Sequence, residues 1–105
     1  MIIIETPIFT RRIQQYLTDE QYREVQQQLI RYPDAGNLIP GSGGLRKLRW
    51  AGAGHGKRGG LRVIYFWAAR LNRQLMLFVY PKTKHEDLSS DQLRALKRII
   101  DEEYP

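Results

Sequence analysis

Residues 61–80 of this chain read LRVIYFWAARLNRQLMLFVY. Two apolar runs, residues 61–68 and 74–80, flank a short polar segment around Asn72. Both runs are rich in β-branched and aromatic residues, which favour strands, and a five-residue connection suits an antiparallel hairpin. The first run is apolar on both faces apart from Arg62, a pattern typical of a central strand. The segment therefore predicts a hairpin in the middle of a sheet.

The preceding segment, residues 45–51, alternates apolar and basic side chains. Alternation with a period of two predicts a strand that turns one face toward a core. Leu48 and Trp50 share one face, which we expect to pack under a helix, while Lys47 and Arg49 share the other. Together with the hairpin, this strand predicts a three-stranded antiparallel meander.

Helix signals lie on both sides of the meander. A serine or threonine followed three residues later by glutamine forms a capping box, which opens a helix. The chain has this signature twice, at Thr18 with Gln21 and at Ser89 with Gln92. In chain order we expect a strand at 2–5, helices at 7–17 and 19–32, a turn-rich loop at 33–44, strands at 45–51, 61–68 and 74–80, and a helix from 90 to 104. The prediction is one α+β domain over residues 1–105, of order β-α-α-β-β-β-α, with a mainly antiparallel sheet, two N-terminal helices and one C-terminal helix.

The composition excludes several classes of protein. The chain has 105 residues, of which 42% are hydrophobic and none is cysteine. A chain of this length and composition can form one modest hydrophobic core. The lack of cysteine excludes a disulfide framework, a thiolate nucleophile and a cysteine-based zinc site. No apolar run reaches the ~18 residues of a membrane span, and the first residues do not resemble a signal peptide. We therefore expect a cytoplasmic protein without a membrane partner.

Charge is strongly segregated along the chain. Between Asp34 and Glu86 there is no acidic residue, yet this segment holds ten of the seventeen lysines and arginines and both histidines. The remaining residues carry seven basic and eleven acidic side chains, a net charge of −4. Because a surface of one sign repels itself, such a segment favours a polyanionic partner, most commonly a nucleic acid.

The short connection of the hairpin also predicts its register. Pairing Ala68 with Gln74 places Arg62 directly opposite Tyr80 on one face of the sheet. Met76, Phe78 and Ile64 are then expected further along that face, because two-residue steps preserve the side of a strand. The open end of the hairpin should therefore hold Arg62 and Tyr80 as cross-strand neighbours.

Further cations converge on this end of the hairpin. Lys82 directly follows the second strand, and Lys57 and Arg58 lie in the glycine-rich loop that enters the strand of Arg62. If Arg49 pairs with Arg62, the basic face of the preceding strand extends the cluster. No acidic residue lies within 23 positions of Arg62. A salt bridge to Arg62 can therefore come only from the distant flanks of the chain, and we expect a substrate phosphate to be its partner instead.

Such a cluster suits phosphate chemistry. Cations around a phosphate stabilise the charge of a phosphoryl-transfer transition state, and a lysine whose pKa is lowered by other cations can accept a proton from a ribose 2′-hydroxyl. Tyr80 can orient the reacting groups or stack on a base. The cluster fits metal-independent RNA cleavage, and it fits plain RNA binding equally well. His55 and His85 lie in two separate loops with nothing to bring them together, and the basic segment has no carboxylate cluster for a metal.

Several motifs together resemble one family of toxins. These are GGLRKLR at 43–49, GKRGGLRVIYF at 56–66, YPKTK at 80–84 and EDLS at 86–89. They are similar to the RelE/ParE superfamily, most closely to its HigB branch. The resemblance runs over essentially the whole chain. It implies the RelE-like fold and the toxin of a type II toxin–antitoxin system, which cleaves mRNA on the translating ribosome without a metal or other cofactor.

The resemblance also implies site residues and partners. Matched to the family's motifs, the cleavage residues are Arg62, Lys57, Arg58, Tyr80 and Lys82, and the RNA-binding residues are Arg46, Lys47, Arg49 and Lys84. The implied partners are the ribosome with its mRNA and a cognate antitoxin, a small helix-turn-helix protein. Where the family has Gly-Lys-Asn after the tyrosine, this chain has Pro81, which stiffens the backbone next to Lys82. A non-catalytic RNA- or ribosome-binding module and a gyrase-inhibiting ParE-like toxin remain as alternatives.

Overall fold

The computed structural model describes residues 1–51, 60–82 and 87–104. In chain order the elements are β1 (Ile2–Glu5), α1 (Pro7–Tyr16), α2 (Asp19–Arg31), β2 (Asn37–Leu38), β3 (Leu45–Trp50), β4 (Leu61–Ala68), the 3-10 turn η1 (Ala69–Leu71), β5 (Arg73–Pro81) and α3 (Ser90–Glu103). Both predicted capping boxes are formed, at the starts of α2 and α3. Among the described residues, no helix is long and apolar enough to cross a membrane.

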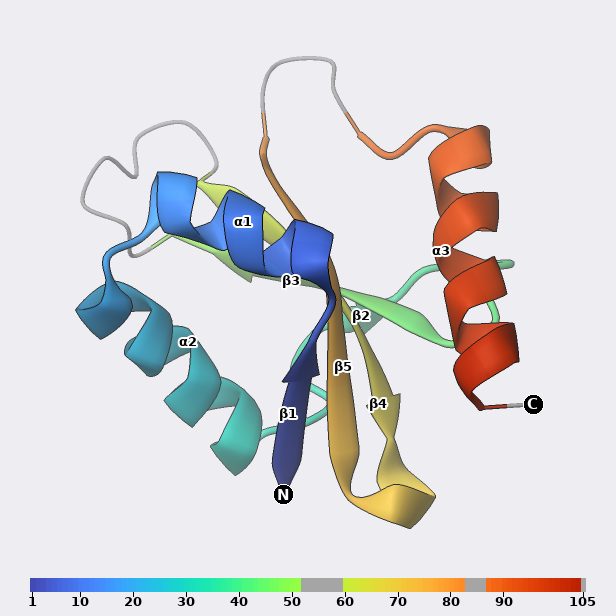
Figure 1. The fold of residues 1–105 in the computed structure, drawn as a ribbon, viewed down its shortest axis with the longest axis horizontal. Helices are drawn as coiled ribbons and strands as arrows, with labels where there is room; N and C mark the ends of the chain where they lie inside the picture. Colours follow the sequence, from blue (N-terminus) through green and yellow to red (C-terminus); the bar gives the residue numbers. More distant parts are fainter. Residues whose placement is uncertain (52–59, 83–86, 105) are drawn as a thin grey trace.

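The strands form one mixed sheet in the order β1-β5-β4-β3-β2. β1 runs parallel to β5, and the other neighbouring strands are antiparallel. Figure 1 shows β4 and β5 in the middle of the molecule, with the helices around them. The α+β class and the central position of β4 are thus confirmed.

The predicted order β-α-α-β-β-β-α is wrong in one respect, because a further strand lies within the expected loop at 33–44. This strand, β2, pairs Asn37 with Lys47 and Leu38 with Arg46. A strand of two residues carries no periodic pattern that a sequence could show. It forms because the outer edge of β3 offers backbone N–H and C=O groups that need partners.

Helices cover both faces of the sheet (Figure 1). α1 and α2 pack on one face, in a buried cluster made of Phe9, Ile13, Leu17, Val25, Leu29, Leu48, Leu61, Val63, Tyr65, Met76 and Val79. α3 packs on the other, in a buried cluster made of Leu45, Ile64, Leu75, Leu77, Tyr80, Leu96 and Ile100. Trp50 is half-buried against the α1/α2 cluster, which confirms the predicted face of Leu48 and Trp50.

The pairing of Arg62 with Tyr80 is confirmed, although the turn of the hairpin differs from the prediction. Ala68 pairs with Arg73 rather than with Gln74, so the turn is one residue shorter than expected. A β-bulge midway along the hairpin inserts one residue into β5 and restores the register. The expected pair at the turn is therefore wrong, while the pair at the open end is right because the two shifts cancel.

The bulge also changes which side chains share a face. It leaves Leu77 of β5 without a residue opposite it on β4. Leu77 and Phe78 consequently both lie on the α3 side, and Met76 turns toward α1 and α2. The expectation that Ile64 and Phe78 share the face of Arg62 and Tyr80 is therefore confirmed, and the same expectation for Met76 is wrong.

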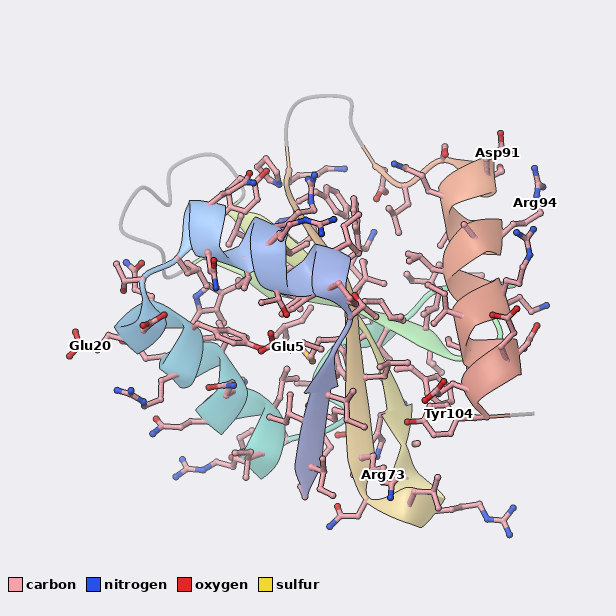
Figure 2. All side chains as sticks on the ribbon, in the orientation of Figure 1. Glu5, Glu20, Arg73, Asp91, Arg94 and Tyr104 are labelled. Carbon is pink, nitrogen blue, oxygen red and sulfur yellow. The ribbon has the colours of Figure 1, made fainter. Side chains whose placement is uncertain are left out.

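Glu5, the last residue of β1, ties both N-terminal helices to the sheet (Figure 2). The Thr10 hydroxyl of α1 donates to Glu5 at 2.6 Å, and the Tyr22 hydroxyl of α2 donates to its second oxygen at 2.6 Å. Burial, together with this hydrogen bond, raises the pKa of Tyr22 well above its ordinary value. Glu5 thus has a structural role on the face away from α3.

Gly60 lies directly before β4, and a substitution there tests how closely the start of this strand packs against the end of β3. Its φ is +60°, and a Cβ would lie 2.3 Å from the carbonyl oxygen of Trp50. We predict that Gly60→Ala lowers the free energy of unfolding by about 2–3 kcal/mol, because backbone strain and this contact add. Gly41→Ala is the matched control, since Gly41 has a φ of +70° but no atom within 4 Å, and it should cost about 1 kcal/mol. Urea denaturation measures both, and equal losses would contradict the prediction.

Candidate functional site

A row of polar side chains crosses three adjacent strands on the α3 side of the sheet. Arg49 of β3 pairs with Arg62 of β4, and Arg62 pairs with Tyr80 of β5. Lys47 lies two residues before Arg49 and Lys82 two residues after Tyr80, so all five point to the same face. We call Lys47, Arg49, Arg62, Tyr80 and Lys82 the cationic corner. The structure thus brings together five of the predicted site residues.

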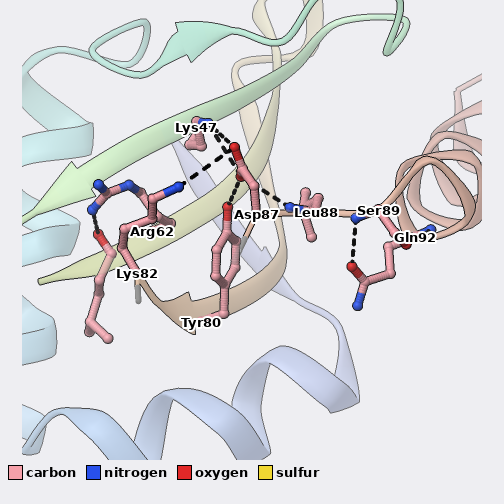
Figure 3. Close-up of polar contacts among 9 residues, drawn as sticks. Lys47, Arg62, Tyr80, Lys82, Asp87, Leu88, Ser89 and Gln92 are labelled. Carbon is pink, nitrogen blue, oxygen red and sulfur yellow. Dashed lines mark hydrogen bonds and ion pairs between the residues drawn. The ribbon is translucent and has the colours of Figure 1, made fainter. Parts of the chain in front are cut away.

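A carboxylate also reaches the cationic corner (Figure 3). One oxygen of Asp87 accepts hydrogen bonds from the Tyr80 hydroxyl at 2.6 Å and from the backbone N–H of Leu88 at 3.0 Å. Its other oxygen lies 3.4 Å from Lys47 Nζ and 3.9 Å from Lys82 Nζ. Three of the five side chains of the cationic corner therefore contact the same carboxylate.

The contact between Tyr80 and Asp87 shifts the pKa of both groups, together with burial. The hydrogen bond from Tyr80 is the main reason that the pKa of Asp87 falls from 3.8 to about 2, so this side chain keeps its negative charge in more acidic solution than an ordinary aspartate does. Burial, and then the hydrogen bond to Asp87, raises the pKa of Tyr80 well above its ordinary value. Tyr80 consequently keeps its proton and serves as a hydrogen-bond donor rather than as a base.

Arg62 is the most buried cation of the cationic corner, with 6% of the residue exposed. Burial lowers its pKa and the neighbouring charge of Arg49 lowers it further, while Tyr80 and Asp87 act in the opposite direction. An arginine nevertheless stays charged in a protein. Nη1 of Arg62 donates to the carbonyl oxygen of Leu61 at 3.4 Å. A positive charge in such a poorly hydrated place acts more strongly on a nearby anion than an exposed one.

Asp87 is the main functional residue that sequence reasoning missed. The sequence places it in the turn before the last helix, and Figure 3 shows it there, next to Leu88 and the N-cap Ser89. Its contact with Lys47 spans 40 positions in the chain, and no local pattern marks it. Asp87 raises the pKa of Arg62, so a carboxylate from beyond the acid-free segment acts on its charge, while the binding of a substrate phosphate there stays a prediction.

Arg46, a predicted RNA-binding residue, lies apart from the cationic corner. Its position alternates with that of Lys47, which puts it on the α1/α2 side of the sheet. There its Nη1 donates to the carbonyl oxygens of Gly36 at 2.8 Å and Asp34 at 3.2 Å. These bonds hold the chain that leads into β2 against β3.

Three other predicted site residues, Lys57, Arg58 and Lys84, lie outside the described residues. The same is true of His55 and His85. Their assignment to the site remains a prediction from the sequence.

A hollow of about 380 Å³ lies beside the cationic corner and is lined by Arg12, Phe78, Tyr80, Asp87, Leu88 and Gln92. The guanidinium carbon of Arg12, from α1, lies 4.5 Å from the centre of the Phe78 ring, and its Nε donates to the Val79 carbonyl at 2.8 Å. Arg12 thus adds a cation from a helix to the edge of the site. The sequence shows no signal for it, because it lies outside the acid-free segment.

Two further observations bear on the chemistry of the site. Within residues 1–51, 60–82 and 87–104, no three histidine, aspartate or glutamate side chains are grouped as metal ligands. A comparison with models of known protein families finds none that matches this chain. The function therefore has to be inferred from the chemistry of the cationic corner.

The depressed pKa of Asp87 predicts a pH dependence of stability. Its ordinary value is 3.8 and its value here is about 2, so the unfolded chain takes up the proton first as the pH falls. The stabilisation by the Asp87 carboxylate should be complete above about pH 4.5 and should decline between pH 4 and pH 2. We predict that Asp87→Asn shows a shallower loss of unfolding free energy over this range than the wild type.

Asp91→Asn is the control for this measurement. Asp91 is an acid of the same segment that does not contact the cationic corner, and its side chain is 87% exposed. Chemical denaturation at several pH values compares the three proteins. An Asp87→Asn profile that runs parallel to the wild type would show that the Tyr80 contact does not act on stability.

Proposed function

We propose that this chain is the toxin of a type II toxin–antitoxin pair, a ribosome-dependent mRNA endonuclease of the HigB kind within the RelE/ParE superfamily. The observation that carries the proposal is the buried Arg62 held between Arg49 and Tyr80. The resemblance of the motifs to the HigB branch supports it from the side of the sequence. The partners in this proposal are the ribosome with its mRNA and a helix-turn-helix antitoxin, in the cytoplasm.

The proposed reaction is an internal transesterification that needs no metal. The ribose 2′-oxygen attacks the adjacent phosphorus while its proton passes to a base, and the bond from phosphorus to the 5′-oxygen breaks. The 5′-oxygen takes up a proton, which leaves a 2′,3′-cyclic phosphate and a 5′-hydroxyl. Negative charge accumulates on the phosphate oxygens in the transition state, and preorganised cations stabilise it there.

The side chains of the cationic corner have distinct roles in this reaction. Arg62, Arg49 and Lys82 stabilise the charge on the phosphate. Tyr80, a protonated phenol, donates a hydrogen bond to a phosphate oxygen or to the leaving 5′-oxygen. The base is a lysine, because arginine does not lose its proton. Lys57 and Arg58 belong to the proposed catalytic set through the family motif.

Burial favours catalysis over simple binding. Surfaces that hold the nucleic-acid backbone by charge alone do so with exposed lysines and arginines, which exchange counterions freely. Arg62 is instead withdrawn from water next to a phenol donor, where its charge acts more strongly on a bound phosphate than an exposed charge would. In vitro translation with a readout of mRNA cleavage, and with gyrase supercoiling as the control, separates the nuclease from the two alternatives.

The role of Arg62 predicts a large loss of activity on truncation. We expect Arg62→Ala to reduce the rate of mRNA cleavage on the ribosome by ~10²–10³, because one preorganised contact to the transition state is lost. Arg70→Ala removes the same charge from an exposed position of the same acid-free segment and should cleave at nearly the wild-type rate. Circular dichroism checks the fold of both. Wild-type cleavage by Arg62→Ala would overturn the catalytic assignment.

The internal mechanism also predicts a dependence on the 2′-hydroxyl. Replacing the ribose on the 5′ side of the cleaved bond by deoxyribose should abolish cleavage at that bond, because the nucleophile is absent. Ribosomes carrying such an mRNA are compared with ribosomes carrying the all-ribose message by mapping the cleaved ends. Deoxyribose one nucleotide further upstream is the control. Cleavage at the substituted bond would mean that water is the nucleophile.

A further inference from the structure

Within residues 1–51, 60–82 and 87–104, Asp87 is the carboxylate that lies among the cations which the proposed function assigns to phosphate. Its side chain is 51% exposed, so water reaches it from one side. Its oxygens nevertheless contact Lys47, Lys82 and the Tyr80 hydroxyl. An aspartate that is merely solvated at the surface does not contact three side chains that come from β3, β5 and the segment after β5.

The contacts of Asp87 are those that a phosphate would make. Ammonium groups and a phenol hydroxyl donate to anionic oxygens, whether these belong to a carboxylate or to a phosphate. In the structure one carboxylate oxygen takes the Tyr80 hydroxyl and the other lies nearest Lys47 and Lys82. A phosphate bound to the same three groups has to replace both oxygens. Two anions a few ångströms apart also repel each other, and this repulsion is stronger near a protein surface than in bulk water.

The backbone of Asp87 is anchored independently of the cationic corner. Leu88 packs against the α3-side core, and Ser89 caps α3, so the position of the carboxylate is tied to this helix. The carboxylate is therefore presented to the cationic corner by α3, not by the sheet that carries the cations. A rotation of the Asp87 side chain toward solvent releases Lys47, Lys82 and Tyr80 without changing the sheet.

We propose that Asp87 is a specificity-determining residue, an internal anion that occupies the phosphate position of the cationic corner and excludes free phosphate and free RNA. This inference rests on the proposed function, because it takes the cationic corner as the site of the scissile phosphate. Only a phosphate that is held in place by other contacts, such as one in ribosome-bound mRNA, displaces the carboxylate. Asp87 thereby makes the cleavage depend on how the RNA is presented.

The matched pair for the test is Asp87→Asn and Asp91→Asn. Each variant removes one negative charge from the segment that begins α3, and the asparagine keeps the size of the side chain. Asp91 pairs with Arg94 on the exposed surface of α3, and Figure 2 shows both at the outer side of this helix. The two variants therefore differ in whether the lost charge lies in the cationic corner.

The probe is a fluorescent single-stranded RNA of ten nucleotides with 2′-O-methyl riboses, which cannot be cleaved through the 2′-oxygen. We expect Asp87→Asn to bind this RNA at least ~10-fold more tightly than the wild type, and Asp91→Asn to change the affinity less than ~2-fold. Inorganic phosphate should compete with the RNA more effectively in Asp87→Asn than in the wild type. Fluorescence anisotropy at a fixed salt concentration measures all of these quantities.

Asp87→Glu shows whether the negative charge of residue 87, rather than the exact position of its side chain, weakens the binding of free RNA. It keeps the anion on a longer side chain, so it should bind the free RNA no more tightly than the wild type. If Asp87→Asn binds like Asp91→Asn, or more weakly than the wild type, the inference is wrong and Asp87 only positions Tyr80. Should Asp87→Asn fail to fold, Asp87→Ser takes its place with the same expected gain, and the absence of that gain is equally decisive.

Failure of this inference is distinguishable from failure of the proposed function. The binding assay needs no cleavage, whereas the proposed function is tested by cleavage on the ribosome. Tighter RNA binding by Asp87→Asn in a protein that never cleaves mRNA would support the internal anion and reject the nuclease. If the wild type cleaves mRNA on the ribosome and Asp87→Asn binds free RNA no more tightly, the nuclease is supported and the internal anion is rejected.

Discussion

The pairing of β4 with β5 is the constraint on which the rest of the structure depends. β1 attaches to β5 and β3 attaches to β4, so both halves of the sheet are placed by this one hairpin. Both buried clusters draw side chains from its two strands. The bulge at Leu77 then decides which side chains of β5 face α3, and it keeps Arg62 opposite Tyr80 despite the shortened turn.

The same pairing places two positive charges side by side at the end of the sheet. Arg62 has Arg49 on one side and Tyr80 on the other, in a place where little water reaches it. Two neighbouring guanidinium groups repel each other, and burial strengthens this repulsion. Asp87 relieves part of it, as the opposite effects of Arg49 and Asp87 on the pKa of Arg62 show. Among the described residues, Asp87 is therefore the acid that balances part of the positive charge of this cluster.

This imbalance connects the fold to the proposed chemistry. The acid-free segment supplies four cations of the site and no carboxylate. In the part of the chain that the structure describes, the acid that reaches the cationic corner comes from beyond the segment, on the approach to α3. Sheet and helix therefore contribute opposite charges to one place. In the proposed function, the same side chains that contact Asp87 in the free protein also bind the external phosphate.

Local patterns in the sequence determined the helices, the long strands and the class of the fold. The capping boxes at Thr18 and Ser89 start a helix through hydrogen bonds within four residues. The apolar runs of the hairpin form strands that pair with each other across a short turn. The charge segregation likewise marked the segment that holds Arg62. Tertiary structure alone decided the short strand at Asn37, the bulge at Leu77 and the arrival of Asp87, because each depends on backbone or side-chain partners supplied by a distant part of the chain.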